Sequence, residues 1–243
     1  MANWNKIEIT LENGQKALAQ APVIVSASRS TDIPAFYCDW FFHRLKVGYS
    51  AWTNPFNGVK MYVSYAKTRF IVFWSKNPRP LLNHIDELKA RGIGCYIQYS
   101  LNDYEEEKLE RGVPPLAERI ETFKKLVDVL GKGSVIWRFD PLVLTEDITI
   151  EKLLNKIENI GDQLKGYTEK LVFSFVDILS YNKVKNNLKA NGISFIDWTE
   201  DQMAEFASRL VALNKEKGWN YKLATCGERG RYPGVEPNHC IDD

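Results

Sequence analysis

Short apolar segments that end abruptly in polar residues recur along this chain, and they are the feature that most restricts its fold. The clearest example is Val135–Pro141, whose apolar residues lead to Arg138, Asp140 and a proline. A buried parallel strand has this pattern, because both of its faces are covered and proline cannot continue the hydrogen-bond ladder. Arg138 and Asp140 are two positions apart, so they point to the same side of the strand. Charges are costly inside a sheet, so we expect this pair at a strand end, in a cleft or in a salt bridge.

Similar segments alternate with stretches of helical periodicity along most of the chain. The other apolar segments are Val23–Val25, Tyr49–Thr53, Val59–Tyr65, Phe70–Trp74, Cys95–Tyr99, Leu171–Val176 and Tyr221–Ala224. Strands that alternate with helices of this length predict βαβ units and a parallel sheet. No glycine-rich phosphate loop follows any of the strands, which disfavours an open nucleotide-binding sheet. The sequence therefore predicts an α/β fold whose parallel strands close into a TIM-like (β/α) barrel.

The length of 243 residues suits one such barrel, which commonly needs about 250 residues. Because no internal repeat or low-complexity linker occurs, we expect residues 1–243 to form a single domain. Within residues 1–21, apolar residues alternate with polar ones before Asn13 and Gly14, which predicts an N-terminal extension or hairpin. Residues 226–243 are rich in glycine and proline and are expected to form a C-terminal tail.

One helix is predicted between the strands Val23–Val25 and Tyr49–Thr53. Pro34 suits its first turn and Gly48 its end. Helical spacing would place four apolar side chains on its packed side, and these are Phe36, Trp40, Phe41 and Leu45.

The composition disfavours several functional classes. The net charge of +1 gives no general attraction to nucleic acid or to an acidic membrane surface. No segment approaches the length of a membrane span, and the N-terminus lacks the apolar core of a secretory signal. Four scattered cysteines indicate reduced thiols, so we expect a cytoplasmic protein without membrane partners.

In a parallel barrel, polar residues at the carboxyl ends of the strands converge on one site. We therefore predict a pocket there for a small polar or anionic substrate. The candidate catalytic residues are Lys76, Asp140 and Asp177. The candidate substrate-binding residues are Arg29, Asp32, Asn54, Asn77, Tyr99, Arg138, Ser174 and Glu228.

Several of these candidates also have a purely structural interpretation. Asp32 and Asn77 are residue types that cap helices, and each precedes a predicted helix. Arg138 and Asp140 could form an internal ion pair instead of contacting a ligand. Lys76 follows five apolar residues, so its amine suits a Schiff base, a phosphate contact or a salt bridge.

A metal site near the C-terminus is a further hypothesis. Cys226, His239 and Cys240 offer soft ligands that suit zinc or an iron–sulfur cluster. Three ligands form an incomplete set, and their spacing matches no strong metal-binding motif. No paired Ser/His or Cys/His signature can be localised, so a hydrolase triad is not predicted.

Five motifs follow one another in order. They are Ser28–Ala35, Asn54–Asn57, Ile71–Pro78, Val135–Pro141 and Ser174–Asp177. Together they resemble a family of bacterial proteins catalogued as a domain of unknown function, over about Ile24 to Asp243. The resemblance implies a partial radical S-adenosylmethionine-like (β/α) barrel. In members with a C-terminal cysteine cluster it also implies a [4Fe–4S] cluster and S-adenosylmethionine. No C-x-x-x-C-x-x-C motif occurs in these residues, so both cofactors are expected only in a longer form.

Three hypotheses on function follow from these observations. The leading one is an enzyme that binds a small polar or anionic substrate at the barrel mouth, with radical chemistry if the cluster segment exists. The second is a metal-assisted or lysine-dependent hydrolase or lyase on the same barrel. The third is a nucleic-acid repair or binding protein, which the near-neutral charge disfavours.

Overall fold

A computed structural model of the chain describes residues 5–27, 31–54, 57–176, 185–186, 190, 192–226 and 232–238. The chain divides into two compact units, Met1–Ile97 and Gln98–Asp243. The organisation of residues 1–243 as one domain stays a prediction. Among the described helices, none combines the length and the hydropathy that crossing a membrane requires.

Seven parallel strands are hydrogen-bonded in the order β11-β10-β9-β8-β7-β6-β3. They are β3 (Ile24–Ala27), β6 (Phe70–Ser75), β7 (Gly94–Ser100), β8 (Val135–Leu142), β9 (Lys170–Phe175), β10 (Lys222–Thr225) and β11 (Glu236–Pro237). The predicted parallel α/β fold is thus confirmed. The described strands do not close into a TIM-like barrel, because their order has two ends, at β3 and at the two-residue β11.

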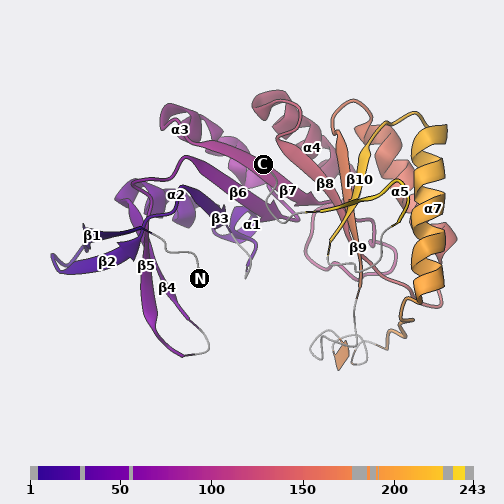
Figure 1. Ribbon diagram of the computed structural model, residues 1–243, viewed down its shortest axis with the longest axis horizontal. Coiled ribbons are helices and arrows are strands. Elements are labelled where there is room, and N and C mark those ends of the chain that lie inside the picture. The colour runs from indigo at the N-terminus through magenta and orange to yellow at the C-terminus, as the bar shows by residue number, and fades with distance from the viewer. Residues whose placement is uncertain are drawn as a thin grey trace. The chain divides into compact units, whose positions relative to one another are not determined.

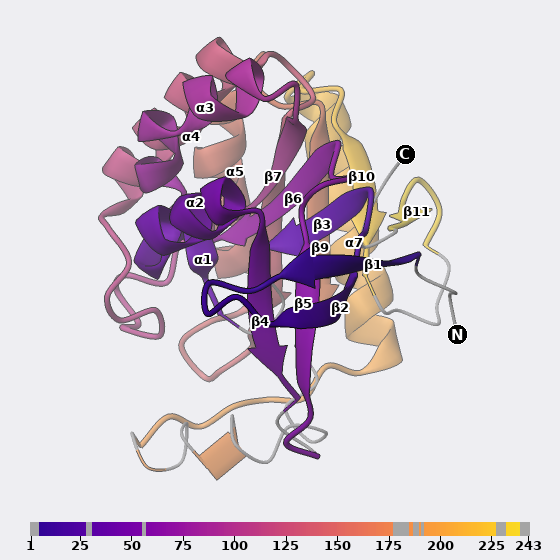
Figure 2. The ribbon, with the colours of Figure 1, turned by 90° about the vertical axis from the view of Figure 1, so that its left-hand side faces the viewer.

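The first unit carries a second sheet, with strand order β1-β2-β5-β4 (Figure 2). Its strands are β1 (Lys6–Thr10), β2 (Lys16–Gln20), β4 (Tyr49–Thr53) and β5 (Lys60–Ser64). β1 and β2 form an antiparallel hairpin, and β5 pairs in parallel with β2 and antiparallel with β4. Two segments expected in the parallel barrel, β4 and β5, therefore belong to a different sheet.

The helices of the first unit differ from the prediction at one break. They are α1 (Ile33–Phe36), α2 (Cys38–Val47), the 3-10 helix η1 (Arg79–Asn83) and α3 (Ile85–Ala90). Tyr37 leaves the helical conformation, so the predicted single helix is divided into α1 and α2. Phe41 and Leu45 are buried as expected, but Phe36 is 72% exposed and Trp40 is 47% exposed. The interpretation of Phe36 and Trp40 as packed residues was wrong, because the helical spacing does not continue through Tyr37.

Strands and helices alternate from β7, whose residues from Gln98 onward belong to the second unit, to β10, as Figure 1 shows. The helices whose bounds are described in the second unit are α4 (Leu116–Leu130), α5 (Ile150–Leu164) and α7 (Glu200–Glu216). Tyr99 of β7 stacks on Phe123 of α4, and Phe173 of β9 meets Phe206 of α7 edge to face. Odd-numbered strand residues therefore face the helices. Because side chains alternate along a strand, the even-numbered residues occupy the opposite face.

A close contact inside the second unit makes Gly161 of α5 sensitive to substitution. A Cβ atom at this position would lie 2.6 Å from Cζ2 and 2.7 Å from Cη2 of Trp219. The indole cannot easily yield, because its Nε1 donates to Asp162 Oδ1 at 2.8 Å and its ring stacks on Tyr221. Gly161→Ala is therefore expected to lower the free energy of unfolding by about 1–3 kcal/mol, as overpacking does.

Urea denaturation would measure this change. Asn155→Ala serves as the control, since Asn155 lies on the exposed side of the same helix. Alanine has the higher helix propensity, so the control is expected to be neutral or stabilising by up to about 0.7 kcal/mol. Equal stability of the wild-type protein and Gly161→Ala would contradict the expected clash.

Candidate functional site

The register of the parallel strands gathers polar side chains at one edge of the second unit. Arg138 of β8 lies opposite Val172 of β9, which in turn lies opposite Ala224 of β10. Parallel neighbours in register point to the same face, so the next even-numbered positions also come together. At and just beyond the carboxyl ends of β8 to β11, these positions are Asp140, Ser174, Cys226 and Asn238.

Arg138 is the centre of this group and is only 3% exposed. Its Nη2 lies 2.5 Å from Asp140 Oδ2, and its Nε donates to the same oxygen at 3.2 Å. Nη1 donates to Gln98 Oε1 at 3.2 Å, and Nη2 also lies 3.4 Å from Cys226 Sγ. Burial acts to lower the pKa of Arg138, but its interactions with Asp140 and Cys226 outweigh burial and raise that pKa. The guanidinium group therefore stays charged within the site.

Asp140 is held in place through both its side chain and its backbone. Oδ2 accepts from Arg138, and Oδ1 accepts a short hydrogen bond from the Ser174 hydroxyl. The buried Asn102 amide accepts from the Asp140 N–H at 2.8 Å and donates to the Asp140 carbonyl at 3.1 Å. The Asp140 side chain nevertheless remains 25% exposed. The site thus presents an oriented carboxylate to the solvent.

A second buried arginine, in the first turn of α4, supports Asn102 in the connection between β7 and α4. Arg119 is 1% exposed, and its Nη1 donates to the Asn102 carbonyl at 2.8 Å while its Nε donates to the Pro114 carbonyl at 2.8 Å. The Asn102 amide also donates to Glu110 Oε1 at 3.0 Å. These contacts fix the backbone of the connection, and through Asn102 they fix the position of Asp140.

Cys226 lies at the end of β10 and is partly exposed. Its sulfur accepts from Asn238 Nδ2 at 3.0 Å and lies 3.4 Å from Arg138 Nη2. The backbone is fixed as well, because the Cys226 N–H donates to the Phe173 carbonyl at 3.2 Å. The thiol therefore has two nitrogen donors within hydrogen-bonding distance of its sulfur.

Four of the predicted site residues come together in this arrangement, and they are Arg138, Asp140, Ser174 and Cys226. The internal ion pair expected as an alternative for Arg138 and Asp140 is present. Tyr99 is not placed to touch a ligand here, because it is fully buried on the helix face and donates to the Arg119 carbonyl. Five predicted residues lie outside the described residues, namely Arg29, Asp177, Glu228, His239 and Cys240.

The remaining predicted residues belong to the first unit. Asp32 caps α1 by accepting from the Ala35 N–H at 3.0 Å, as the structural alternative predicted, and it also accepts from the Lys76 N–H at 2.8 Å. Asn77 does not cap the next helix, because η1 begins at Arg79 and no side chain caps it. Asn54 lies in the connection between β4 and β5, which belong to the other sheet. Lys76 follows β6, and its catalytic role stays a prediction.

Two residues of the site were absent from the predicted set, Gln98 and Asn238, whereas Asn102 was expected among the polar residues at the strand ends. Alternation along β7 could have identified Gln98, since it shares the even-numbered face with Arg138. Asn102 lies beyond the end of β7, and its contact with Asp140 depends on how the connection folds back. Asn238 follows a two-residue strand that the sequence pattern does not reveal.

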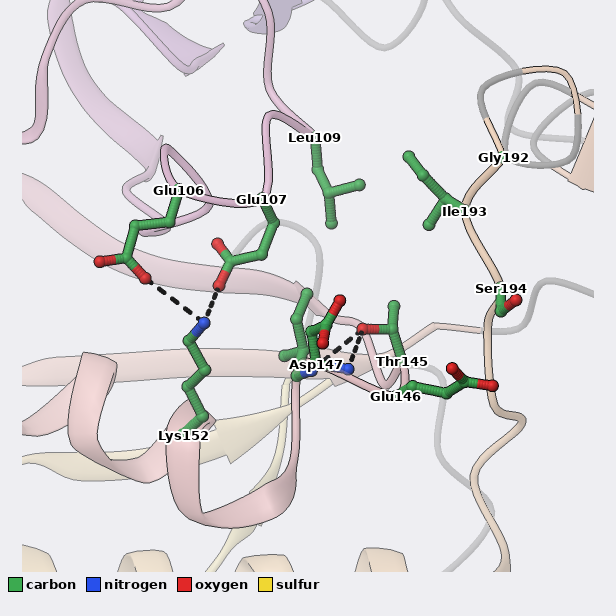
Figure 3. Close-up of a pocket in the computed structure, with 11 residues that line it drawn as sticks. Glu106, Glu107, Leu109, Thr145, Glu146, Asp147, Lys152, Gly192, Ile193 and Ser194 are labelled. Atoms are coloured by element: carbon green, nitrogen blue, oxygen red, sulfur yellow. Dashed lines mark hydrogen bonds and ion pairs between the residues drawn. The ribbon is translucent and has the colours of Figure 1, made fainter.

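A separate pocket of about 440 Å³ also lies in the second unit (Figure 3). Lys152 Nζ pairs there with Glu106 at 3.3 Å and with Glu107 at 2.7 Å. Burial acts to raise the pKa of Glu107, but the hydrogen bond from Lys152 and the charge of Lys156 lower it below its usual value. The acidic lining is thus partly neutralised by the protein's own lysines, and we assign no ligand to this pocket.

Residues 24–243 match the model of the family described as Domain of unknown function (DUF1848). The chain belongs to this family. The resemblance expected over about Ile24 to Asp243 is therefore confirmed, and the candidate site lies within the range that matches DUF1848. The relation to radical S-adenosylmethionine enzymes is not part of this match. A comparison with curated proteins found no match.

The described part of this DUF1848 chain does not fit an iron–sulfur cluster. Within it, no group of three or more His, Cys, Asp or Glu side chains could hold a metal ion. Burial raises the pKa of Cys38 to about 12 and that of Cys95 to about 11, so neither thiol ionises readily at neutral pH. Iron and zinc bind the ionised form. Cys226 is the other described cysteine, and its sulfur contacts Arg138 and Asn238.

Proposed function

We propose that this protein is an enzyme that binds a small polar molecule at the carboxyl ends of β8, β9 and β10. The observation that carries the proposal is Asp140, whose carboxylate is fixed by Arg138 and Ser174 while a quarter of its side chain stays exposed. Holding a charged group in one orientation at a sheet edge costs free energy of folding. Such arrangements are concentrated at functional sites.

The chemistry of the site favours ligands that donate hydrogen bonds. The Arg138 guanidinium already contacts Asp140, Gln98 and Cys226, so it is less suited to clamp an anionic substrate than the sequence suggested. The exposed part of Asp140 is an acceptor for a hydroxyl or ammonium group. Since the carboxylate is already oriented, a ligand need not pay the entropy of ordering it. We therefore favour a ligand that offers hydroxyl or amine groups to Asp140.

A partial (β/α) barrel is the architecture that we propose around this site. In the second unit β7, β8, β9 and β10 are neighbours in the order of the chain, with helices between them. Right-handed crossovers between consecutive parallel strands place their helices on one face and leave the other face open. Barrel enzymes bind their substrates at the carboxyl ends of the strands, where Asp140 and Ser174 lie. Radical chemistry, expected from the family resemblance, stays a hypothesis for a longer form.

A ligand screen with one isosteric variant would test the proposal. Ligand-observed NMR with nucleosides, sugars, amino acids and polyamines is expected to find binding that Asp140→Asn weakens about tenfold or more, because a hydrogen bond to a charged acceptor contributes about 1.5–3 kcal/mol. Asp128→Asn is the matched control, since Asp128 is exposed on α4, and it is expected to leave the affinity unchanged. Equal affinity of the wild-type protein and Asp140→Asn, or no binding from any of these classes, would overturn the proposal.

A further inference from the structure

Gln98 of β7 brings to the candidate site a hydrogen-bond donor that no described residue uses. The residue is 1% exposed, and its Oε1 accepts from Arg138 Nη1 at 3.2 Å. An arginine can only donate, so this contact fixes the amide with its oxygen at Arg138 and its NH₂ group directed away from the guanidinium. Among the described residues, none accepts a hydrogen bond from that NH₂ group. A buried donor without a partner costs free energy, so a ligand oxygen that accepts from it would gain affinity.

Asp140 offers the complementary group, one remaining acceptor position. An ionised carboxylate can accept roughly four hydrogen bonds. Nε and Nη2 of Arg138 and the hydroxyl of Ser174 supply three of them. The Asp140 side chain is 25% exposed, so a donor from outside the protein can reach the carboxylate. The site therefore presents an unused acceptor at Asp140 and an unused donor at Gln98.

Hydroxyl groups match this pair better than an ammonium group does. A hydroxyl both donates and accepts, so two neighbouring hydroxyls can donate to Asp140 and accept from Gln98. An ammonium group carries three donors and no acceptor, so it would leave the Gln98 donor unused and find one acceptor position for its three N–H groups. The charge of Asp140 is moreover already balanced by Arg138. An ammonium group would therefore lose hydration with little electrostatic attraction in return.

We infer that the ligand of this site is a neutral molecule with two neighbouring hydroxyl groups, such as a sugar or a nucleoside. One hydroxyl donates to the Asp140 carboxylate, and the next accepts from Gln98 Nε2. Both protein groups bind nitrogens of the same rigid guanidinium, so their relative position is set before the ligand arrives. The inference rests on the proposed function and narrows its choice between hydroxyl and amine ligands to hydroxyl ligands.

Matched ligands test the two hydroxyl contacts in the wild-type protein. Ligand-observed NMR titrations would compare ribose with deoxyribose and uridine with deoxyuridine, since each deoxy compound lacks one of the neighbouring hydroxyls. Its removal is expected to weaken binding about two- to tenfold, as the loss of a neutral hydrogen bond does. Putrescine and glycine, which present ammonium groups, are expected to bind more weakly than either diol. The relative affinities of ribose and uridine distinguish a free sugar from a nucleoside as the source of the diol.

Two variants of Gln98 change the donor itself. Gln98→Glu keeps an acceptor for Arg138 and replaces the N–H donors with a negative charge, so the affinity for putrescine is expected to rise about tenfold or more. Misfolding cannot produce such a gain. Gln98→Met removes the donor at similar volume and is expected to weaken the binding of uridine about two- to tenfold. Gln163→Glu is the matched control, because Gln163 is exposed on α5, and it is expected to leave both affinities unchanged.

The outcomes separate this inference from the proposed function. Equal affinity for a diol and its deoxy counterpart, or affinities that neither Gln98 variant changes, would mean that Gln98 donates to water only and would overturn the inference. Tighter binding of putrescine or glycine than of the diols would overturn it as well, and the proposed function would stand if Asp140→Asn weakens that binding. Diol binding that depends on Gln98 but not on Asp140 would support the Gln98 contact and overturn the proposed role of Asp140. No binding of any of these probes would overturn the inference.

Discussion

Arg119→Met is expected to lower the free energy of unfolding by about 3–5 kcal/mol, the usual cost of breaking a buried ion pair from one side. Arg119 is 1% exposed, and its guanidinium donates to the carbonyl groups of Asn102 and Pro114 and to Glu105. Glu110 Oε2 lies 3.9 Å from it and its side chain is 9% exposed. Methionine fills a similar volume but provides no donor, so the carbonyl groups and Glu110 would lose a buried partner.

Urea denaturation of the wild-type protein and the variant would measure this loss. Arg209→Met is the matched control, because Arg209 pairs with Glu151 and Glu205 on the protein surface and is 40% exposed. A surface ion pair contributes about 0–1 kcal/mol, so the control is expected to change the stability little. A loss below about 1 kcal/mol for Arg119→Met would mean that water replaces the missing donors, and the connection between β7 and α4 would then not be a rigid support.

The core of the candidate site was predictable because it depends on short-range rules. Apolar strands with polar ends predicted a parallel sheet, and alternation placed Arg138 and Asp140 on one face. Carboxyl ends of parallel strands share an edge, which brought Ser174 and Cys226 into the prediction. The register of β8, β9 and β10 confirms this reasoning for these four residues.

The misplaced features depend on contacts that alternation and helical periodicity do not encode. Tyr99 was placed at the site because it ends a strand, yet its odd position turns it toward α4, where it stacks on Phe123. Asn54 ends a strand as well, but that strand pairs antiparallel with β5. The pairing partner of a short strand is decided by tertiary packing, so the segment alone could not assign it to either sheet. The contact between Asn102 and Asp140 joins the connection after β7 to β8, and no short-range sequence pattern indicates it.

Arg138 and Asp140 are expected to be strongly coupled in their effect on stability. Replacing both should therefore lower the free energy of unfolding by less than the sum of the two single replacements. Asp140→Ala leaves the guanidinium 3% exposed without its carboxylate, and we expect a loss of about 3–5 kcal/mol. Arg138→Met is expected to cost less, about 2 kcal/mol, because the Asp140 carboxylate is 25% exposed and can be hydrated where Arg138 cannot. The double variant removes both charges, which avoids an unpaired buried charge.

A double-mutant cycle in urea measures the coupling directly. We expect an interaction energy of about 2 kcal/mol, within the usual range for groups in one hydrogen-bond network. Gln98 and Ser174 would still lose a partner in the double variant, so the stability should not return fully to that of the wild-type protein. Additive losses within about 0.5 kcal/mol would show that the two groups act independently. In that case Arg138 would not hold the Asp140 carboxylate in place, and the oriented acceptor on which ligand binding is proposed to depend would have to be fixed by Ser174 and Asn102 alone.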